Sequence, residues 1–229
     1  MTDARKPNPP PPPAPPGPAP AHEAAERRDW AAYFQRMEGK PPRATLLHAL
    51  ERFGAFDPNE APLAVDLGCG SGQDAVAILE RGWRLWACDE NDEGLRRLRE
   101  RPACAQALAR DRLTIRQSGF ETVRIPPAAL VNASFSLPFC PPHAFPALWA
   151  KIDAALTAGG PGGRFSGQFF GDRDDWAVLE DRTHLTRAET LALFDQYILE
   201  HFEEEDRPSK QTGEAHKHWH VFHVVARKR

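Results

Sequence analysis

Residues 65–72 read Val65-Asp66-Leu67-Gly68-Cys69-Gly70-Ser71-Gly72. The apolar stretch that begins at Leu63 and runs into this segment is typical of a buried strand, and residues 74–80 have the composition of a helix. Glycines between a strand and a helix let a ligand approach the backbone closely, beside the positive end of the helix dipole. The segment therefore predicts a strand, a ligand-binding turn and a helix.

Strands and helices continue to alternate after this unit. Helices are predicted at 93–101, 145–156 and 187–194, and further strands at 85–89, 113–116, 129–133, 163–169, 197–203 and 219–226. Alternation of this kind favours a parallel sheet with helices on both faces. Because no helix separates the last two strands, they should form an antiparallel hairpin. We expect an α/β fold with a doubly wound, seven-stranded, mostly parallel sheet and a C-terminal antiparallel hairpin.

The N-terminal region differs from the rest of the 229 residues. Ten of the 23 prolines lie within residues 1–20, so residues 1–21 are predicted to be a disordered tail and 22–229 a single domain. Apolar residues at helical spacing follow the tail: Trp30, Tyr33, Phe34 and Met37. Such a stripe is most often that of a helix that packs on the domain, and the same helix could also form a lid over a ligand.

The composition of the chain limits the classes of binding partner that we expect. A formal net charge of -3 gives no reason to expect nucleic acid or an anionic membrane as a partner, and no apolar run is long enough to span a bilayer. We expect a cytoplasmic protein with a small-molecule substrate and an oligomeric state that one sequence does not define. Neither a disulfide framework nor a zinc site is expected, because no CxxC spacing occurs among Cys69, Cys88, Cys104 and Cys140. His216, His218 and His220 alternate, but we expect strand histidines there rather than a metal site.

The glycine motif resembles that of a known enzyme class. Its D-x-G-x-G-x-G form, with Asp89 following Asp66 by 23 residues at the end of the next strand, is similar to the first two motifs of class I S-adenosylmethionine-dependent methyltransferases. Dinucleotide enzymes instead use G-x-G-x-x-G, and Gln73 stands where their third glycine would fall. Within this class, the chain resembles the branch that includes tellurite-resistance and thiopurine methyltransferases. The resemblance lies in the order of three segments: Trp30-x-x-Tyr33-Phe34, then Gly39-Lys40-Pro41-Pro42, then the glycine motif.

The resemblance implies roles for residues around the cofactor. The acidic Asp66 would suit the ammonium group of S-adenosylmethionine, and Asp89 would accept hydrogen bonds from both ribose hydroxyls, with Glu90 as the weaker alternate. Arg43 could pair with the cofactor carboxylate or be a solvated arginine at a helix start. The predicted cofactor-binding residues are Asp66, Gly68, Cys69, Gly70, Asp89, Glu90, Gly119, Phe120 and Ala133.

The acceptor is expected beyond the carboxyl ends of the central strands. Residues that follow the fourth and fifth strands are the candidates: Ser134, Phe135, Phe139 and Trp176 for substrate binding, and His184 as a general base or a loop hydrogen-bonding residue. Their composition favours a small, partly apolar acceptor and lacks the basic residues of a nucleic-acid groove. The implied reaction is methyl transfer by in-line displacement.

Two other functions are compatible with a glycine-rich turn between a strand and a helix. A dinucleotide-dependent oxidoreductase is opposed by the glycine spacing and by the terminal hairpin. A cofactor-binding scaffold protein without catalysis, recruited through its proline-rich tail, is opposed by the presence of both Asp66 and Asp89.

Overall fold

The computed structural model describes residues 29–160, 162–208 and 217–229. The predicted tail, residues 1–21, lies outside this part of the chain. None of the described helices combines the length and apolarity needed to cross a bilayer.

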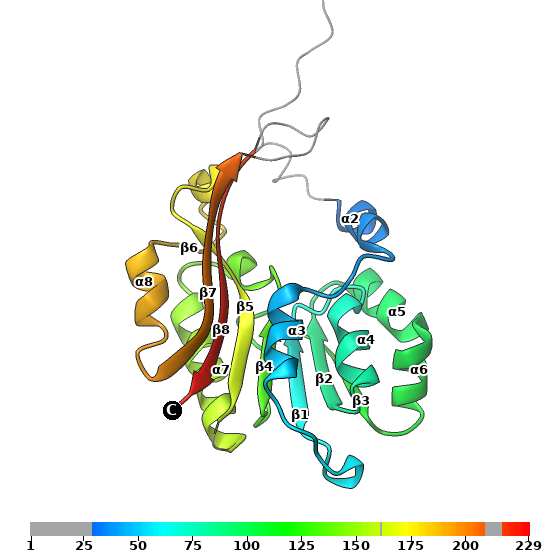
Figure 1. Cartoon of the computed structure of the whole chain (residues 1–229). Coiled ribbons are helices and arrows are strands. Elements are labelled where there is room, and N and C mark those ends of the chain that lie inside the picture. Colours follow the sequence, from blue (N-terminus) through cyan, green and yellow to red (C-terminus); the bar gives the residue numbers. More distant parts are fainter. Residues whose placement is uncertain (1–28, 161, 209–216) are drawn as a thin grey trace, which may run out of the picture.

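Eight strands of the described residues form one sheet (Figure 1). Its order is β3 (Leu113–Gln117), β2 (Arg84–Asp89), β1 (Leu63–Leu67), β4 (Leu130–Ala133), β5 (Arg164–Gly171), β8 (His218–Lys228) and β7 (Tyr197–Pro208). The first five are parallel, and β8 runs antiparallel to both of its neighbours. The predicted fold class and hairpin are confirmed. The sequence reading omitted β6 (His184–Leu185), a two-residue strand beside β5.

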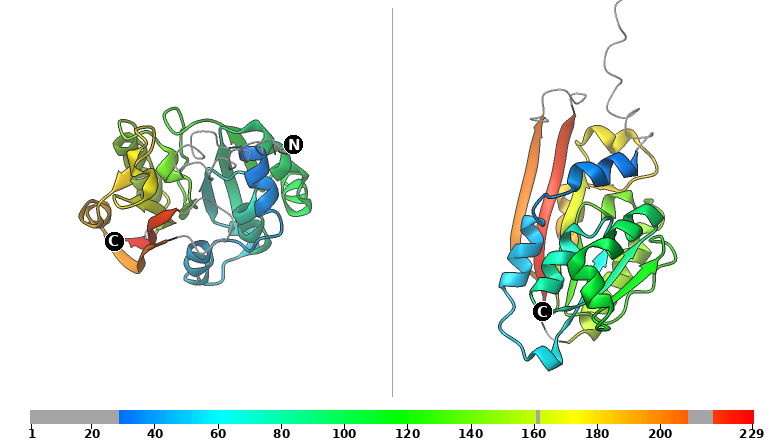
Figure 2. Two further views of the ribbon diagram at one scale, coloured as in Figure 1. Left: turned by 90° about the horizontal axis from the view of Figure 1, so that it is seen from above. Right: turned by 90° about the vertical axis from the view of Figure 1, so that its right-hand side faces the viewer.

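Helices cover both faces of the sheet (Figures 1 and 2). One face packs against α3 (Ala44–Glu51), α4 (Gln73–Glu80), α5 (Asp92–Glu100) and α6 (Pro102–Leu108), and the other packs against α7 (Phe145–Ala158). The short α8 (Arg187–Ala192) leads into β7. Alternation along β1 divides its side chains between the two cores, with Val65 and Leu67 on the α7 side and Ala64 on the other. Asp66 therefore shares a face with α3 and α4.

Local sequence explains the helix starts nearest the site. Asn91 accepts a hydrogen bond from the Gly94 N–H at 2.9 Å and so caps α5, directly after β2. Asp29 caps α2 (Trp30–Met37) in the same way through the Ala32 N–H. Figure 1 shows α2 beyond the carboxyl ends of the strands, where it can cover a ligand.

The C-terminal hairpin is longer than predicted. Its register continues from Tyr197 opposite Lys228 to Pro208 opposite His218. The sequence prediction stopped at Glu203 because the charged residues that follow lack an apolar alternation. Ion pairs between the strands, such as His223 Nε2 to Glu205 at 3.1 Å, accompany the pairing there.

Candidate cofactor and acceptor site

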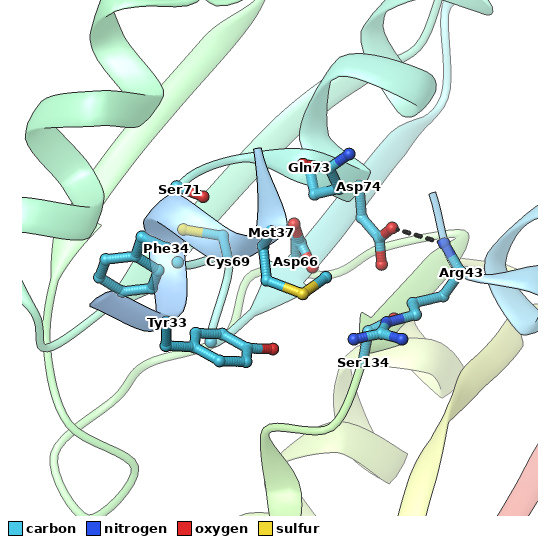
Figure 3. A pocket seen from close by; sticks show the side chains of 12 residues that line it. Tyr33, Phe34, Met37, Arg43, Asp66, Cys69, Ser71, Gln73, Asp74 and Ser134 are labelled. Carbon is cyan, nitrogen blue, oxygen red and sulfur yellow. Dashed lines mark hydrogen bonds between the residues drawn. The ribbon is translucent and has the colours of Figure 1, made fainter. Parts of the chain in front are cut away.

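Two adjoining cavities lie at the carboxyl ends of β1, β2 and β4, where the strand order reverses. Ligands of open α/β sheets bind at such a switch point. The first cavity is lined by Tyr33, Phe34, Met37, Arg43, Asp66, Gly68, Cys69, Gly70, Ser71, Gln73, Asp74 and Ser134 (Figure 3). The second is lined by Trp30, Tyr33, Phe34, Gly68, Gly70, Asp89, Glu90, Asn91, Ser118, Gly119, Phe120, Glu121, Ser134, Phe135, Ser136, Phe139 and Pro141. The glycine turn and Ser134 border both cavities, so a ligand in one can meet a ligand in the other.

The glycine turn uses its N–H groups within the protein. Those of Gly68 and Cys69 donate to the Cys88 carbonyl at 2.8 and 3.0 Å, and that of Gly70 donates to Asp89 Oδ2 at 2.8 Å. A pyrophosphate needs free donors at this turn, whereas an ammonium group needs acceptors. The turn is therefore suited to a cation rather than to a dinucleotide phosphate.

Glycine is required at two points of the turn. Gly68 has a φ of 69°, and a side chain on it would overlap Ser136, whose hydroxyl donates to the Leu67 carbonyl at 2.6 Å. Gly70 has a φ of 49°, and a Cβ there would lie 3.0 Å from the ring of Phe34. Phe34 thus packs directly on the turn, so α2 both packs on the domain and covers the two cavities. The packing expected of the aromatic stripe is observed, and its role as a lid stays a prediction.

Asp66 belongs to a buried polar network that crosses the sheet. The strand register places Asp66 beside Asn132 of β4 and Asn132 beside Ser166 of β5. Asn132 Nδ2 donates to Asp66 Oδ1 at 2.9 Å and to Asp74 Oδ2 at 3.0 Å, while the Ser166 hydroxyl donates to Asn132 Oδ1 at 2.8 Å. Asp74 also accepts the Arg43 N–H at 2.9 Å (Figure 3). These bonds fix the carboxylates of Asp66 and Asp74 at the edge of the first cavity.

One oxygen of Asp66 is left for a ligand. The residue is 2% exposed, and its Oδ2 is buried without a hydrogen-bond partner among the described residues. Burial and then the nearby charge of Asp74 raise the pKa of Asp66 to about 8. A buried carboxylate without a counter-charge is costly, so a bound cation would be favoured strongly at this position.

Arg43 adds a positive charge on the opposite side of the first cavity. It precedes α3, and within the described residues its guanidinium forms no ion pair. The same guanidinium lies 4.6 Å from the centroid of the Phe135 ring. The first cavity therefore offers a carboxylate and a guanidinium, which suits the ammonium and carboxylate groups of an amino acid.

Asp89 lies at the end of β2, between the two neighbouring loops. Its Oδ2 accepts the Gly70 N–H and its Oδ1 accepts the Asn91 N–H, both at 2.8 Å. Each carboxylate oxygen can accept a second bond, so the residue can order both loops and still bind hydroxyl groups in the second cavity. Burial raises the pKa of Asp89. Glu90 is exposed at the rim of the same cavity.

Aromatic side chains form the outer part of the second cavity. Trp30 of α2 contacts Phe139 of η2 (Leu137–Phe139) in an edge-to-face arrangement with centroids 5.5 Å apart. Phe135 follows β4 and has a left-handed φ of 52°, unusual for a bulky residue. The acidic Asp89, Glu90 and Glu121 are the charged residues that line this cavity in the described chain. The lining of the second cavity therefore combines aromatic side chains with acidic groups.

The structure brings most of the predicted site residues together. Asp66, Gly68, Cys69 and Gly70 line the first cavity, and Asp89, Glu90, Gly119 and Phe120 line the second. Ala133 is fully buried in the α7-side core and, in the part of the chain described, lines neither cavity. Ser134, Phe135 and Phe139 lie where an acceptor was expected.

Trp176 and His184 lie behind the aromatic side chains that line the second cavity. Trp176 of η3 (Asp175–Val178) packs behind Phe139, with ring centroids 6.5 Å apart, and the His184 ring lies 5.7 Å from that of Phe170. Burial lowers the pKa of His184. Neither residue lines a cavity of the described structure, so a direct role in substrate binding or catalysis stays a prediction.

The hairpin also groups possible metal ligands. Ligand atoms of Glu204, Asp206 and His220 lie within 4.8 Å of one another. The Arg173 guanidinium contacts Glu204 at 2.7 Å and Asp206 at 2.6 Å, so it already supplies the positive charge that these carboxylates need. We assign an ion-pair network to these residues.

Several lining residues were missed by the sequence reading. Asp74 borders the first cavity, Ser71 and Gln73 line it as well, and Asn132 orients Asp66 from within the sheet. The signal was a polar residue inside an otherwise apolar strand, as in Leu130–Ala133, because buried polar groups need specific partners.

Comparison with known proteins agrees with this geometry. Residues 64–160 match the family model described as methyltransferase domain. This match places a methyltransferase domain at residues 64–160. The match bears out the predicted family and enzyme class, that of methyltransferases. A search of curated protein sequences finds no match.

Solved structures show the same fold at low identity. TehB from Haemophilus influenzae is 12% identical with a TM-score of 0.67, and the alignment covers 88% of this chain and 68% of TehB. The 1,6-didemethyltoxoflavin-N1-methyltransferase of Burkholderia thailandensis is 20% identical with a TM-score of 0.58 over 95% and 93% of the two chains. An O-methyltransferase family 2 protein from Planctomyces limnophilus is 17% identical with a TM-score of 0.56, covering 88% and 62%.

Proposed function

We propose that the chain transfers the methyl group of S-adenosylmethionine to a small, partly apolar acceptor by in-line displacement where the two cavities meet. The observation that carries this proposal is the buried Asp66 Oδ2, which has no hydrogen-bond partner among the described residues, beside a turn in which the Gly68, Cys69 and Gly70 N–H groups already donate within the protein. That combination suits an ammonium group and opposes a dinucleotide phosphate, so it disfavours the oxidoreductase alternative.

The residues present fit the cofactor. Asp66 would hold its ammonium group and Arg43 its carboxylate, both in the first cavity. Asp89 would accept the ribose hydroxyls in the second cavity, with the adenine near Gly119 and Phe120. S-adenosylmethionine supplies a methyl group on a sulfonium that is already a good leaving group.

The chain's own contribution is positioning and exclusion of water. Holding two reactants in line can account for much of a rate enhancement. Trp30, Tyr33 and Phe34 of α2 border the second cavity, and Phe135 and Phe139 line its acceptor side. This lining supports an acceptor with an apolar ring. The Burkholderia thailandensis enzyme, which has bound 1,6-didemethyltoxoflavin and S-adenosylhomocysteine, supports a small acceptor by similarity.

The function is tested in two steps on the full chain. Calorimetry should show binding of S-adenosylmethionine and S-adenosylhomocysteine, with no binding of NAD. A metabolite extract incubated with tritiated S-adenosylmethionine should then yield a labelled small molecule, with heat-denatured protein as control. Tight NAD binding without a response to S-adenosylmethionine would overturn the cofactor assignment, and label confined to RNA, DNA or protein would overturn the acceptor class.

The affinity for S-adenosylmethionine is expected to rise from about pH 6 to about pH 8, because Asp66, with a pKa of about 8, must lose its proton to pair with an ammonium group. Binding below about pH 8 should therefore release a proton. Above that range the affinity should fall, because the ordinary pKa of an α-amino group is about 7.7–8.0. Calorimetry in two buffers of different ionisation enthalpy measures both the affinity and the proton release.

Asp66→Asn is the matched variant for this pH dependence. Its amide oxygen can still accept the bond from Asn132, but it carries no charge, so the rising limb should be lost. An affinity that rises with pH equally in both proteins would show that another group controls it.

A further inference from the structure

Phe135 has a backbone that needs support from elsewhere in the fold. Its φ of 52° lies in the left-handed region, which bulky side chains rarely adopt and which persists only where the surroundings impose it. The residue follows β4 directly and lines the second cavity. Whatever holds this backbone also places the Phe135 ring.

Gln168 of β5 provides that support. Its Oε1 accepts the Phe135 N–H at 3.0 Å, and its Nε2 donates to Thr45 Oγ1 at 2.8 Å. Gln168 is 1% exposed and Thr45 is 3% exposed, so water competes little with either bond. The two bonds join the loop after β4 to the first turn of α3 through a side chain that lines neither cavity of the described structure.

The side chain of Phe135 is held from the same direction. Arg43, the residue before α3, places its guanidinium 4.6 Å from the ring centroid, while its own N–H is bound to Asp74. Gln168 therefore fixes the backbone of Phe135 to the helix whose start reaches into the first cavity.

We propose that Gln168 is a positioning residue that, through the Phe135 N–H and Thr45, holds the acceptor wall in register with the cofactor cavity. This rests on the proposed function, since Phe135 is taken as part of the acceptor site. Small displacements of a positioning group are enough to lower turnover strongly. Loss of Gln168 should thus affect the acceptor far more than the cofactor.

Four variants of the full chain test the proposal. Gln168→Met removes both bonds, and Thr45→Val removes only the outer one. Gln168→Glu, which burial keeps protonated, retains an oxygen for the Phe135 N–H and an O–H that can donate to Thr45 Oγ1. Thr190→Val is the control, because Thr190 is also fully buried and loses a hydroxyl bond to the Thr186 carbonyl, far from the cavities.

Two readouts separate positioning from general loss of structure. With the acceptor identified by the tritium screen, Gln168→Met should raise its KM about tenfold and leave the affinity for S-adenosylmethionine within about threefold. In the complex of isotope-labelled protein with S-adenosylhomocysteine, the Phe135 amide should exchange with solvent about tenfold faster in Gln168→Met. In Gln168→Glu, the acceptor KM and the exchange rate of the Phe135 amide should both be within about threefold of wild type. In Thr45→Val, both values should lie between those of wild type and of Gln168→Met.

The outcomes are distinct. The proposal is overturned if Gln168→Met changes the acceptor KM and the Phe135 exchange no more than Thr190→Val does, or if it weakens cofactor and acceptor equally. If Gln168→Met does not fold, Thr45→Val and Gln168→Glu decide by the same criteria. A wild-type protein that binds S-adenosylhomocysteine but labels no small molecule overturns the proposed acceptor class, while the exchange measurement still decides whether Gln168 holds Phe135.

Discussion

Asp89→Ala is expected to weaken the binding of S-adenosylmethionine by about 10- to 100-fold, because the substitution removes charged hydrogen bonds that are worth roughly 1–3 kcal/mol. Two effects add together. The ribose hydroxyls lose their acceptor, and the Gly70 and Asn91 N–H groups lose the bonds that order the turn and the start of α5. Calorimetry with S-adenosylhomocysteine, which has no reactive methyl group, measures the effect without turnover.

Glu90→Ala is the matched control for Asp89→Ala. Glu90 lines the same cavity from an exposed position, so its loss should change the affinity by no more than about threefold. A larger loss in Glu90→Ala than in Asp89→Ala would assign the ribose to Glu90 and contradict the proposed role of Asp89.

Local patterns were enough to predict most of the fold. The strand at 63–67 was predicted with its observed bounds, since an apolar run followed by a glycine turn has few other solutions. The helix α6 was missed because its seven residues alternate alanine with other residue types and lack an apolar stripe. The outer half of the hairpin was missed because its strands are held by cross-strand charged pairs such as Glu205 with His223, which no local pattern reveals.

The cofactor side of the site was more predictable than the acceptor side. Asp66 lies a few residues before the glycine turn, and Asp89 lies one helix and one strand after it. The placement of both residues therefore follows from the fold alone. Phe34 on Gly70 and Gln168 on Phe135 are contacts between segments 36 and 33 residues apart. Such contacts depend on how the helices pack, and the polar Ser166 and Gln168 among the aromatic residues of β5 are the local signal that buried polar partners exist.

Phe135 and Trp176 were both predicted from the sequence to bind the acceptor, but their packing in the structure leads us to expect different effects of their substitution. Phe135 lines the second cavity, whereas Trp176 lies among Phe139, Phe170 and Trp219 behind the wall. Removal of a buried tryptophan costs about 3–5 kcal/mol of folding stability, so Trp176→Ala should mainly lower the melting temperature. Its remaining activity at low temperature should be close to that of wild type.

Phe135→Ala is expected to lower kcat/KM for the labelled acceptor by about 10- to 100-fold, equivalent to about 1.4–2.8 kcal/mol of transition-state binding. The ring forms part of the acceptor wall, and its contact with the Arg43 guanidinium keeps that wall close to the cofactor. The affinity for S-adenosylhomocysteine should change by less than about tenfold, because the predicted cofactor contacts lie on β1, β2 and their loops. Steady-state kinetics, calorimetry and thermal melts on Phe135→Ala and Trp176→Ala together measure these differences. Normal kcat/KM in Phe135→Ala, with a large loss in a folded Trp176→Ala, would move the acceptor from the Phe135 side to the η3 side of the wall.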